Sequence, residues 1–356
     1  MQIDVEKLQY LLNEACASGE EYGCQLAIYH HGKLVADLNA GKVAPTGKDV
    51  VSDTLFPVYS VSKGLTTTLA HILCQEGKLD FNANVADYWP EFGCNGKENI
   101  KVWMVFTHRA GLFTMPELKF FDEQADWAAM IKYMEEAEPV TEPGGVCRYH
   151  GITFGWLAGE IISRAGGKPF NELFREKVLV PLGIEREFFF GTDDESETRV
   201  TLSEPCCEAN KTEWRTNFIN SPAIRRSCIP SANGFGSARA LARVYASLCG
   251  NGVDGVKLLR DDVIANAVIP RRAADDPLDQ GPARWALFGM GWALSGPDSN
   301  RSLIFGHGGA LGAEGLAYPE LDLAIGFTKN KFNTTHPVHP LRDRISEALN
   351  INIRHW

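Results

Sequence analysis

The sequence has no excess of positive charge and no long apolar run. Its formal net charge is −10, with no cluster of lysine and arginine residues, so nucleic acids and anionic lipid surfaces are poor partners for it. No window is apolar for long enough to span a bilayer. We therefore expect a small-molecule substrate, with no nucleic-acid and no membrane partner, and the oligomeric state stays open.

Signals for export are also missing. The segment MQIDVEKLQYLLNEACASGE lacks a basic start, an apolar core and a small-residue cleavage site. The nine cysteines are odd in number, scattered, and form no C-x-x-C pair, which is typical of reduced thiols rather than of a disulfide framework. These absences predict a cytoplasmic protein.

Motifs of several other enzyme classes do not occur. The chain has no G-x-S-x-G pattern, which counts against an α/β-hydrolase. It has no H-E-x-x-H pattern or Cys/His cluster that would hold a metal, and no Walker or G-x-G-x-x-G pattern that would bind a nucleotide. The sequence therefore predicts neither a metal site nor a cofactor.

The patterns that are present predict strands at both ends of the chain and helices between them. Two apolar runs around Gly32 indicate a β-hairpin, and three more short strands are expected near the end of the chain. Helical periodicity marks the first residues, the last ones and several internal segments. The acidic run 191–197 is interpreted as a solvated loop. The strands are expected at 24–41, 302–309, 314–320 and 321–330, and the helices at 5–15, 66–77, 125–137, 153–167, 237–252 and 341–349.

This order of elements predicts one antiparallel sheet built from both chain ends, carrying helices and a large helical insertion. No repeat and no linker divides the chain. We expect a single α/β (α+β) domain, in which residues 1–65 and 230–356 form the sheet region and residues 66–229 form a mostly helical region.

A serine and a lysine stand three positions apart where an apolar segment meets a helical run. Ser60 and Lys63 form the only S-x-x-K pattern of the chain, and Pro57 before them suits a helix start. Both side chains then share one helix face. A lysine can deprotonate a serine only when it is neutral, and burial and a helix N-terminus both favour that form. The alternative is a helix cap at Ser60 and a surface lysine.

Two further elements follow in a fixed order: Tyr149-His150-Gly151, and His307-Gly308-Gly309-Ala310 after the apolar run SLIF. Together with the S-x-x-K pattern they resemble the group that contains class C serine β-lactamases, family VIII carboxylesterases and serine D-peptidases. The resemblance covers nearly the whole chain. It implies a β-lactamase/transpeptidase-like fold and an acyl-enzyme formed on Ser60.

The resemblance also implies roles for individual residues. Tyr149 would move a proton between Ser60, the leaving group and water, and it would lie near Lys63, whose cationic form would lower the pKa of the phenol. The backbone N–H groups of Ser60 and Ala310 would bind the oxyanion. Whether Lys63 or Tyr149 is the first base stays open.

The third element would form one edge of the substrate cleft. His307 would stand beside the substrate there, and Gly308 and Gly309 would let it approach the backbone closely. Asn233, in the stretch 230–239 on the far side, would contact the substrate or serve a turn. The stretch 107–112, T-H-R-A-G-L, resembles a structural turn of the same group.

Two departures from the group's pattern bear on the substrate. Gly151 stands where the β-lactamases carry an asparagine that holds a substrate amide, and His307 stands where they carry a lysine near the substrate carboxylate. Both changes weaken recognition of β-lactams and peptides, whereas the acylating residues are kept. We therefore expect a carboxylesterase for small, fairly apolar acyl esters, with Phe121, Trp285 and Phe288 as candidates to line an acyl pocket.

Three other functions stay open at this point. A β-lactamase or D-amino-acid peptidase or amidase would use the same acyl-enzyme on an amide bond. A transacylase would pass the acyl group to an alcohol or amine instead of water. A non-catalytic binding or scaffold member would need none of Ser60, Lys63 and Tyr149, so their joint presence argues against it.

Overall fold

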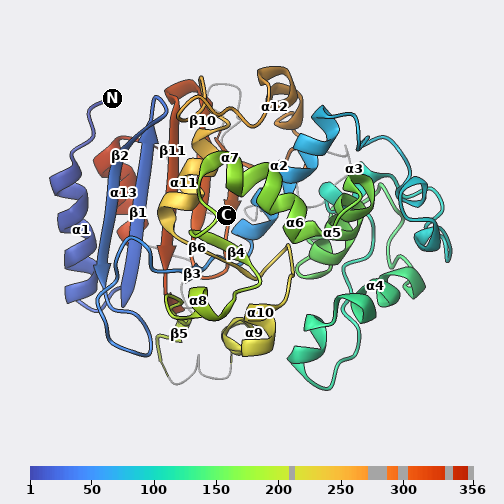
Figure 1. The fold of residues 1–356 in the computed structure, drawn as a ribbon, viewed down its shortest axis with the longest axis horizontal. Coiled ribbons are helices and arrows are strands. Elements are labelled where there is room, and N and C mark those ends of the chain that lie inside the picture. Colours follow the sequence, from blue (N-terminus) through green and yellow to red (C-terminus); the bar gives the residue numbers. More distant parts are fainter. Residues whose placement is uncertain (208–212, 272–286, 296–303, 333–339, 352–356) are drawn as a thin grey trace.

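A seven-stranded antiparallel sheet forms the centre of the protein, in the strand order β2-β1-β11-β10-β9-β8-β7. The computed structural model describes residues 1–207, 213–271, 287–295, 304–332 and 340–351. Strand β1 near the start of the chain pairs with β11 near its end, so the predicted sheet from both termini is confirmed (Figure 1). The strands are β1 (Gly23–His30), β2 (Lys33–Gly41), β7 (Leu287–Phe288), β8 (Ala293–Ser295), β9 (Ile304–Gly308), β10 (Glu314–Tyr318) and β11 (Leu323–Lys329).

The predicted hairpin and the two terminal helices are present. The turn between β1 and β2 places Gly32 at a φ of 68°, in the left-handed region that glycine adopts readily. Helices α1 (Val5–Ala17) and α13 (Pro340–Leu349) pack against one another and against one face of the sheet. That face is closed by apolar side chains at helical spacing, such as Leu8, Leu12, Leu341 and Ile345.

The opposite face of the sheet is buried as well. Along β1, Leu26 and Ile28 face the two terminal helices, while Ala27 and Tyr29 face the larger core on the other side. Helix α11 (Ala238–Ala246) covers this second face and contacts β11, β1 and β10. Because both faces are covered, β1 and β11 are apolar along almost their whole length instead of alternating.

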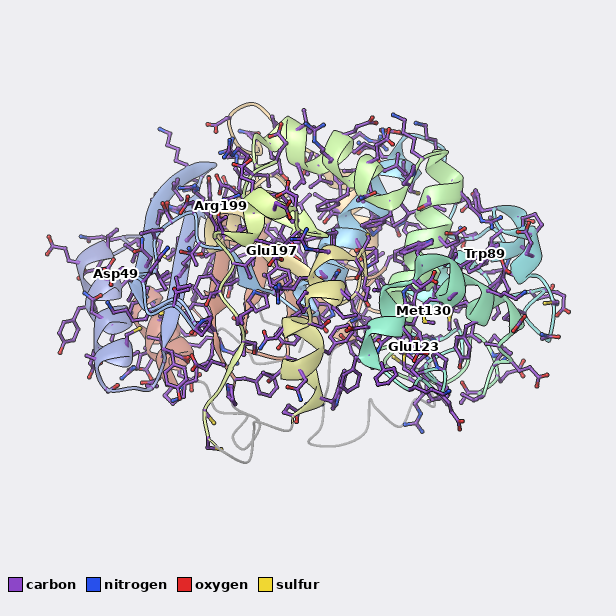
Figure 2. All side chains as sticks on the ribbon, turned by 60° about the horizontal axis from the view of Figure 1, so that its bottom comes forward. Asp49, Trp89, Glu123, Met130, Glu197 and Arg199 are labelled. Carbon is purple, nitrogen blue, oxygen red and sulfur yellow. The ribbon has the colours of Figure 1, made fainter. Side chains whose placement is uncertain are left out.

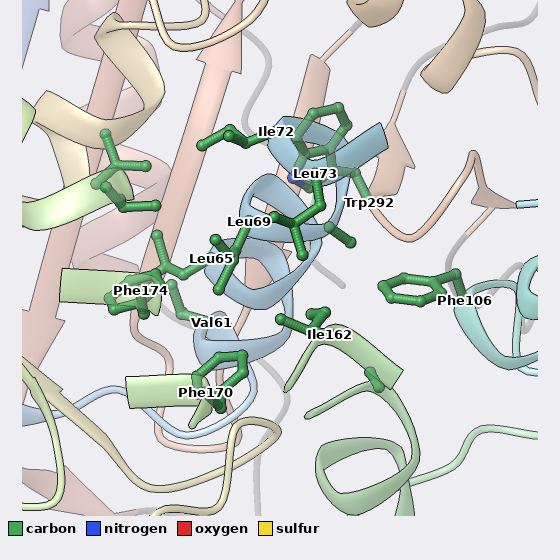
Figure 3. Packing of buried hydrophobic residues seen from close by; sticks show 14 of the residues in the cluster. Val61, Leu65, Leu69, Ile72, Leu73, Phe106, Ile162, Phe170, Phe174 and Trp292 are labelled. Atoms are coloured by element: carbon green, nitrogen blue, oxygen red, sulfur yellow. The ribbon is translucent and has the colours of Figure 1, made fainter. Parts of the chain in front are cut away.

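Helix α2 (Val61–Gln75) runs through the larger core and is buried on all sides from Val61 to Leu73. Figure 3 shows its apolar side chains among residues of neighbouring elements, including Phe106, Ile162 and Trp292. Its buried polar side chains are hydrogen-bonded to surrounding backbone, as Thr66 is to the Pro230 carbonyl at 2.7 Å. The enclosure fixes the first turn of α2, which begins directly after Ser60.

The middle of the chain supplies the predicted helical region. Helix α5 (Thr153–Gly166) packs against α2, α3 (Val102–Phe106), α4 (Trp127–Glu136) and α6 (Phe170–Phe174). Figure 2 labels Trp89 and Met130, two buried residues of this region. The remaining helices are α7 (Val180–Leu182), α8 (Asp194–Glu197), α9 (Trp214–Asn220), α10 (Pro222–Arg226) and α12 (Asp261–Ala267), with the short turns η1 (Val85–Asp87), η2 (Pro90–Phe92), η3 (Phe121–Ala125), η4 (Arg175–Leu179) and η7 (Pro319–Leu321).

One expectation about the middle of the chain is wrong. The acidic run 191–197 contains helix α8 instead of a loop. The Asp193 carboxylate accepts a hydrogen bond from the Ser196 N–H at 2.7 Å, and the Ser196 hydroxyl accepts one from the Asp193 N–H at 2.9 Å. This reciprocal cap satisfies the first backbone donors of the helix, and acidic side chains are favourable in a first turn.

Two small sheets lie outside the main one and were not predicted. Strand β6 (Gly234–Gly236) pairs with β3 (Phe56–Pro57) and with β4 (Phe188–Phe190), and β5 (Glu204–Pro205) pairs in parallel with β12 (Lys331–Phe332). The sheet of β3, β6 and β4 holds the segment that leads into α2. Among the helices of the described residues, none combines the length and apolar character that crossing a bilayer requires.

Candidate active site

Ser60 lies at the junction between strand β3 and helix α2, as the sequence predicts. The Val58 N–H donates to the Gly234 carbonyl at 2.9 Å, and Tyr59 then turns the chain with a φ of 48°. Pro57 belongs to β3 and not to the first turn of the helix, which corrects the expectation. Ser60 is the N-cap residue of α2, but its side chain makes no capping hydrogen bond. The Ser60 hydroxyl therefore remains available for chemistry.

Lys63 is fully buried in the first turn of α2. Its Nζ lies 3.3 Å from the Ser60 Oγ and donates to the Ser231 carbonyl at 2.9 Å. No carboxylate among the described residues forms an ion pair with it. Burial therefore lowers the pKa of the Lys63 amine well below its usual range. The structure thus excludes a surface lysine at this position and favours the neutral amine next to the serine.

Tyr149 comes shortly before helix α5 and completes the group. Its ring centre lies 4.9 Å from the Lys63 Nζ, and its hydroxyl shares a hydrogen bond with Ser60. The nonpolar surroundings raise the pKa of the phenol, and the hydrogen bond with Ser60 opposes that rise. This reverses the expected direction, because the lysine that would have lowered the pKa of the phenol is itself driven toward its neutral form.

His307 lies on strand β9 on the other side of Lys63, and its imidazole is buried. The Nδ1 lies 2.7 Å from the Gly308 carbonyl, which can only accept a hydrogen bond, so the Nδ1 carries the proton. Burial lowers the pKa of His307 to about 3. This position therefore presents no positive charge to a substrate near neutral pH.

The segment after β9 lies against the turn that carries the serine. A Cβ atom placed on Gly309 would meet the Val58 carbonyl oxygen at 2.3 Å. Gly309 is therefore required by the close approach of two backbone segments. That Gly308 and Gly309 let a substrate approach the backbone stays a prediction. Within the described part of the chain, no acceptor takes the backbone N–H of Ser60 or of Ala310. Both donors remain available at the two sides of this contact.

Asn233 does not lie where a substrate could reach it. The residue is completely buried, and its Oδ1 accepts from the Ile229 N–H at 2.8 Å. Its Nδ2 donates to the carbonyls of Ile224 at 2.8 Å and Ser227 at 2.7 Å. Its hydrogen-bonding groups are thus satisfied inside the loop 224–233. Asn233 therefore stabilises the turn, and the expected contact with the substrate is wrong.

Three aromatic residues were candidates for an acyl pocket. Phe288 stands next to the site, with its ring centre 6.3 Å from that of Tyr149 and 6.4 Å from that of His307. Phe121 is half exposed and its ring contacts Trp214, away from these residues. Trp285 lies outside the described residues.

Two histidines near the site were missed as functional residues. The rings of His108 and Tyr149 lie 4.8 Å apart, and His150 directly follows Tyr149. Burial lowers the pKa of both histidines, that of His150 to about 4. The T-H-x-x-G-L stretch was the available signal for His108, but its spacing alone does not show that it folds back onto the tyrosine.

The chain is similar to known proteins over most of its length. The beta-lactamase family model matches residues 11–350. The chain belongs to this family. The esterase/beta-lactamase LipL of Mycobacterium tuberculosis is 30% identical over 350 residues, spanning 87% of this chain and 77% of LipL.

Solved structures of family members have the same fold. A family VIII carboxylesterase superposes with a TM-score of 0.86 at 28% identity, over 98% of this chain and 99% of the other. A penicillin-binding protein homologue from Caulobacter crescentus gives a TM-score of 0.84 at 28% identity, over 97% and 96% of the two chains. The predicted β-lactamase/transpeptidase-like fold is thereby confirmed.

Proposed function

We propose that this protein is a serine carboxylesterase that hydrolyses small, fairly apolar acyl esters through an acyl-enzyme on Ser60. One observation carries the proposal: Ser60 is hydrogen-bonded to both Lys63 and Tyr149, and no carboxylate of the described residues pairs with the buried Lys63. A hydroxyl needs a nearby base to become a nucleophile, and the buried neutral amine supplies one. The names of the esterase relatives support the same activity.

The pKa directions divide the proton transfers between the two partners. Lys63, whose pKa is lowered, accepts the Ser60 proton as the Oγ attacks the ester carbonyl. The N–H groups of Ser60 and Ala310 stabilise the oxyanion. Tyr149, whose pKa is raised, stays protonated and can pass a proton to the leaving alkoxide. Water then enters and gives a proton to the Tyr149 phenolate as it attacks the acyl group. The Lys63 ammonium returns a proton to the Ser60 Oγ as the acid leaves, which restores the starting state.

The preference for esters follows from what surrounds the nucleophile. Neutral His307 offers no cation to a substrate carboxylate, and Gly151 itself has no side chain that could hold a substrate amide. Phe288 and Tyr149 instead present aromatic surface. An uncharged ester with a short acyl chain suits this surface better than a β-lactam or a peptide.

The direct test measures hydrolysis of p-nitrophenyl acetate, butyrate and octanoate beside nitrocefin. We expect ester turnover that is lost in Ser60→Ala, little nitrocefin cleavage, and a fluorophosphonate adduct that peptide mapping places on Ser60. Ser18→Ala, an exposed serine at the end of α1, is the matched control and should behave as wild type. Fast nitrocefin turnover would refute the substrate preference, and activity surviving in Ser60→Ala would refute the mechanism.

A further inference from the structure

His108 binds the backbone on both sides of Tyr149. Its carbonyl accepts a hydrogen bond from the Arg148 N–H at 2.8 Å, and its Nδ1 accepts one from the His150 N–H at 3.2 Å. The residue lies just after α3, is buried, and has a φ of 59°. One residue in a left-handed conformation thus holds the peptide units before and after the tyrosine.

These hydrogen bonds fix which nitrogen of each histidine carries a proton. A backbone N–H can only donate, so the Nδ1 of His108 must be the unprotonated nitrogen. In His150 the Nε2 accepts from the Leu112 N–H at 3.1 Å, and the Nδ1 lies 2.6 Å from the Arg148 carbonyl, to which it donates. Both rings must therefore be neutral, and burial lowers the pKa of each in agreement with this.

The position of Tyr149 depends on this arrangement because much of the residue is exposed to solvent. Tyr149 is 45% exposed, and its ring rests on His108 and Phe288. Its hydroxyl reaches Ser60. A small rotation of the backbone at 148–150 would be amplified along the tyrosine side chain. A proton donor displaced by about 1 Å loses much of its effect on rate.

We propose that His108 is a positioning residue that holds Tyr149 against Ser60 and Lys63 through the lone pair of its Nδ1. The role builds on the proposed esterase mechanism, since it matters only if Tyr149 transfers protons. His108 does not contact the reacting atoms in this scheme. It acts through the backbone of the tyrosine segment.

Two substitutions of similar polarity separate this role from simple packing. The Oδ1 of asparagine occupies the place of the histidine Nδ1, and asparagine also tolerates a positive φ. The amide oxygen of glutamine lies one bond further out, at the place of the Nε2. We expect His108→Gln to lower kcat by about 10- to 100-fold with little change in KM, and His108→Asn to restore most of that loss. Equal activities of the two variants would overturn the proposal.

A double-mutant cycle shows whether His108 acts through Tyr149. In a Tyr149→Phe background, where the proton donor is already gone, His108→Gln should lower kcat by no more than about twofold. If His108→Gln instead damages the structure in general, its loss of kcat should be as large in the Tyr149→Phe background as in wild type. That result would overturn the proposal. Thermal unfolding of each variant reports whether folding itself has changed.

The outcome for the esterase function is read separately. If wild type hydrolyses none of the esters, the proposed function fails, whereas the rate at which a fluorophosphonate labels Ser60 still compares the variants at position 108. Faster labelling of the Asn variant than of the Gln variant supports the positioning role, and equal labelling overturns it.

Discussion

Gly309→Ala should damage the active site more than it damages the fold. The added Cβ would lie 2.3 Å from the Val58 carbonyl oxygen, 3.2 Å from its carbonyl carbon and 3.4 Å from the Tyr59 Cβ. The nearest of these atoms are backbone, so no side-chain rotation can relieve the contact. The segment after β9 and the turn that carries Ser60 must therefore separate by about 1 Å to restore ordinary contact distances.

Two magnitudes follow from that separation. Overpacking of a buried contact costs about 1–3 kcal/mol, which lowers the Tm of a protein of this size by a few degrees. A shift of about 1 Å between a nucleophile and the groups that stabilise its transition state costs roughly 100-fold in rate. Since Ser60 is two residues from Val58 and Ala310 follows Gly309, we expect kcat/KM to fall roughly 100-fold while most of the protein remains folded.

The assay compares kcat/KM for p-nitrophenyl butyrate with thermal unfolding in Gly309→Ala and in Gly151→Ala. Gly151 is the matched control, because it also adjoins the site but a Cβ there would meet no atom of the described residues within 4 Å. Gly151→Ala should keep the wild-type Tm and most of its activity. Wild-type kcat/KM in Gly309→Ala, or an equal loss in both variants, would refute the assignment of this contact.

Three further predictions concern Lys63, His307 and Asn233. Lys63→Met should abolish ester turnover yet raise the Tm near neutral pH. Burial lowers the pKa of Lys63 in the folded protein, so below the ordinary lysine pKa the lysine takes up a proton on unfolding, which favours the unfolded state. The gain in Tm from removing this lysine should therefore shrink as the pH rises toward about 10. The pH–rate profile should show no histidine ionisation between about pH 5 and 8, because the pKa of His307 is about 3; a step near pH 6.5 that disappears in His307→Gln would contradict this. Asn233→Ala should lower the unfolding free energy by roughly 3 kcal/mol in urea titrations, since it strands several buried backbone groups, with KM unchanged; a raised KM at wild-type stability would return Asn233 to the substrate site.

The sequence alone predicts the elements that depend on local periodicity. The hairpin at β1 and β2, the strands β9 to β11 and the helices α1, α2, α4, α5, α11 and α13 all appear where apolar spacing indicates them. It also predicts the order of the three site elements, because Ser60 and Lys63 are fixed by a helical spacing and the other two by their resemblance to the family.

The parts that could not be predicted depend on contacts between distant segments. The local sequence around Gly309 does not show that the Val58 carbonyl approaches this glycine. The amide of Asn233 could equally face a cleft or its own loop. The direction of the Tyr149 pKa depends on whether Lys63 is charged, and burial of Lys63 is a property of the assembled core. Likewise, only the folded chain shows His108 next to Tyr149.

The pairing of β1 with β11 has a consequence for how the protein is made. During synthesis the chain leaves the ribosome from its N-terminal end, so Ser60 and α2 emerge long before β9 and β11 exist. Strand β1 must wait for β11, which is translated long after it. The nucleophile therefore meets the Gly309 segment only after β9 and the residues that follow it have been translated. Esterase activity in a translation reaction would thus report chains that extend past β11, and shorter nascent chains would carry an inactive serine.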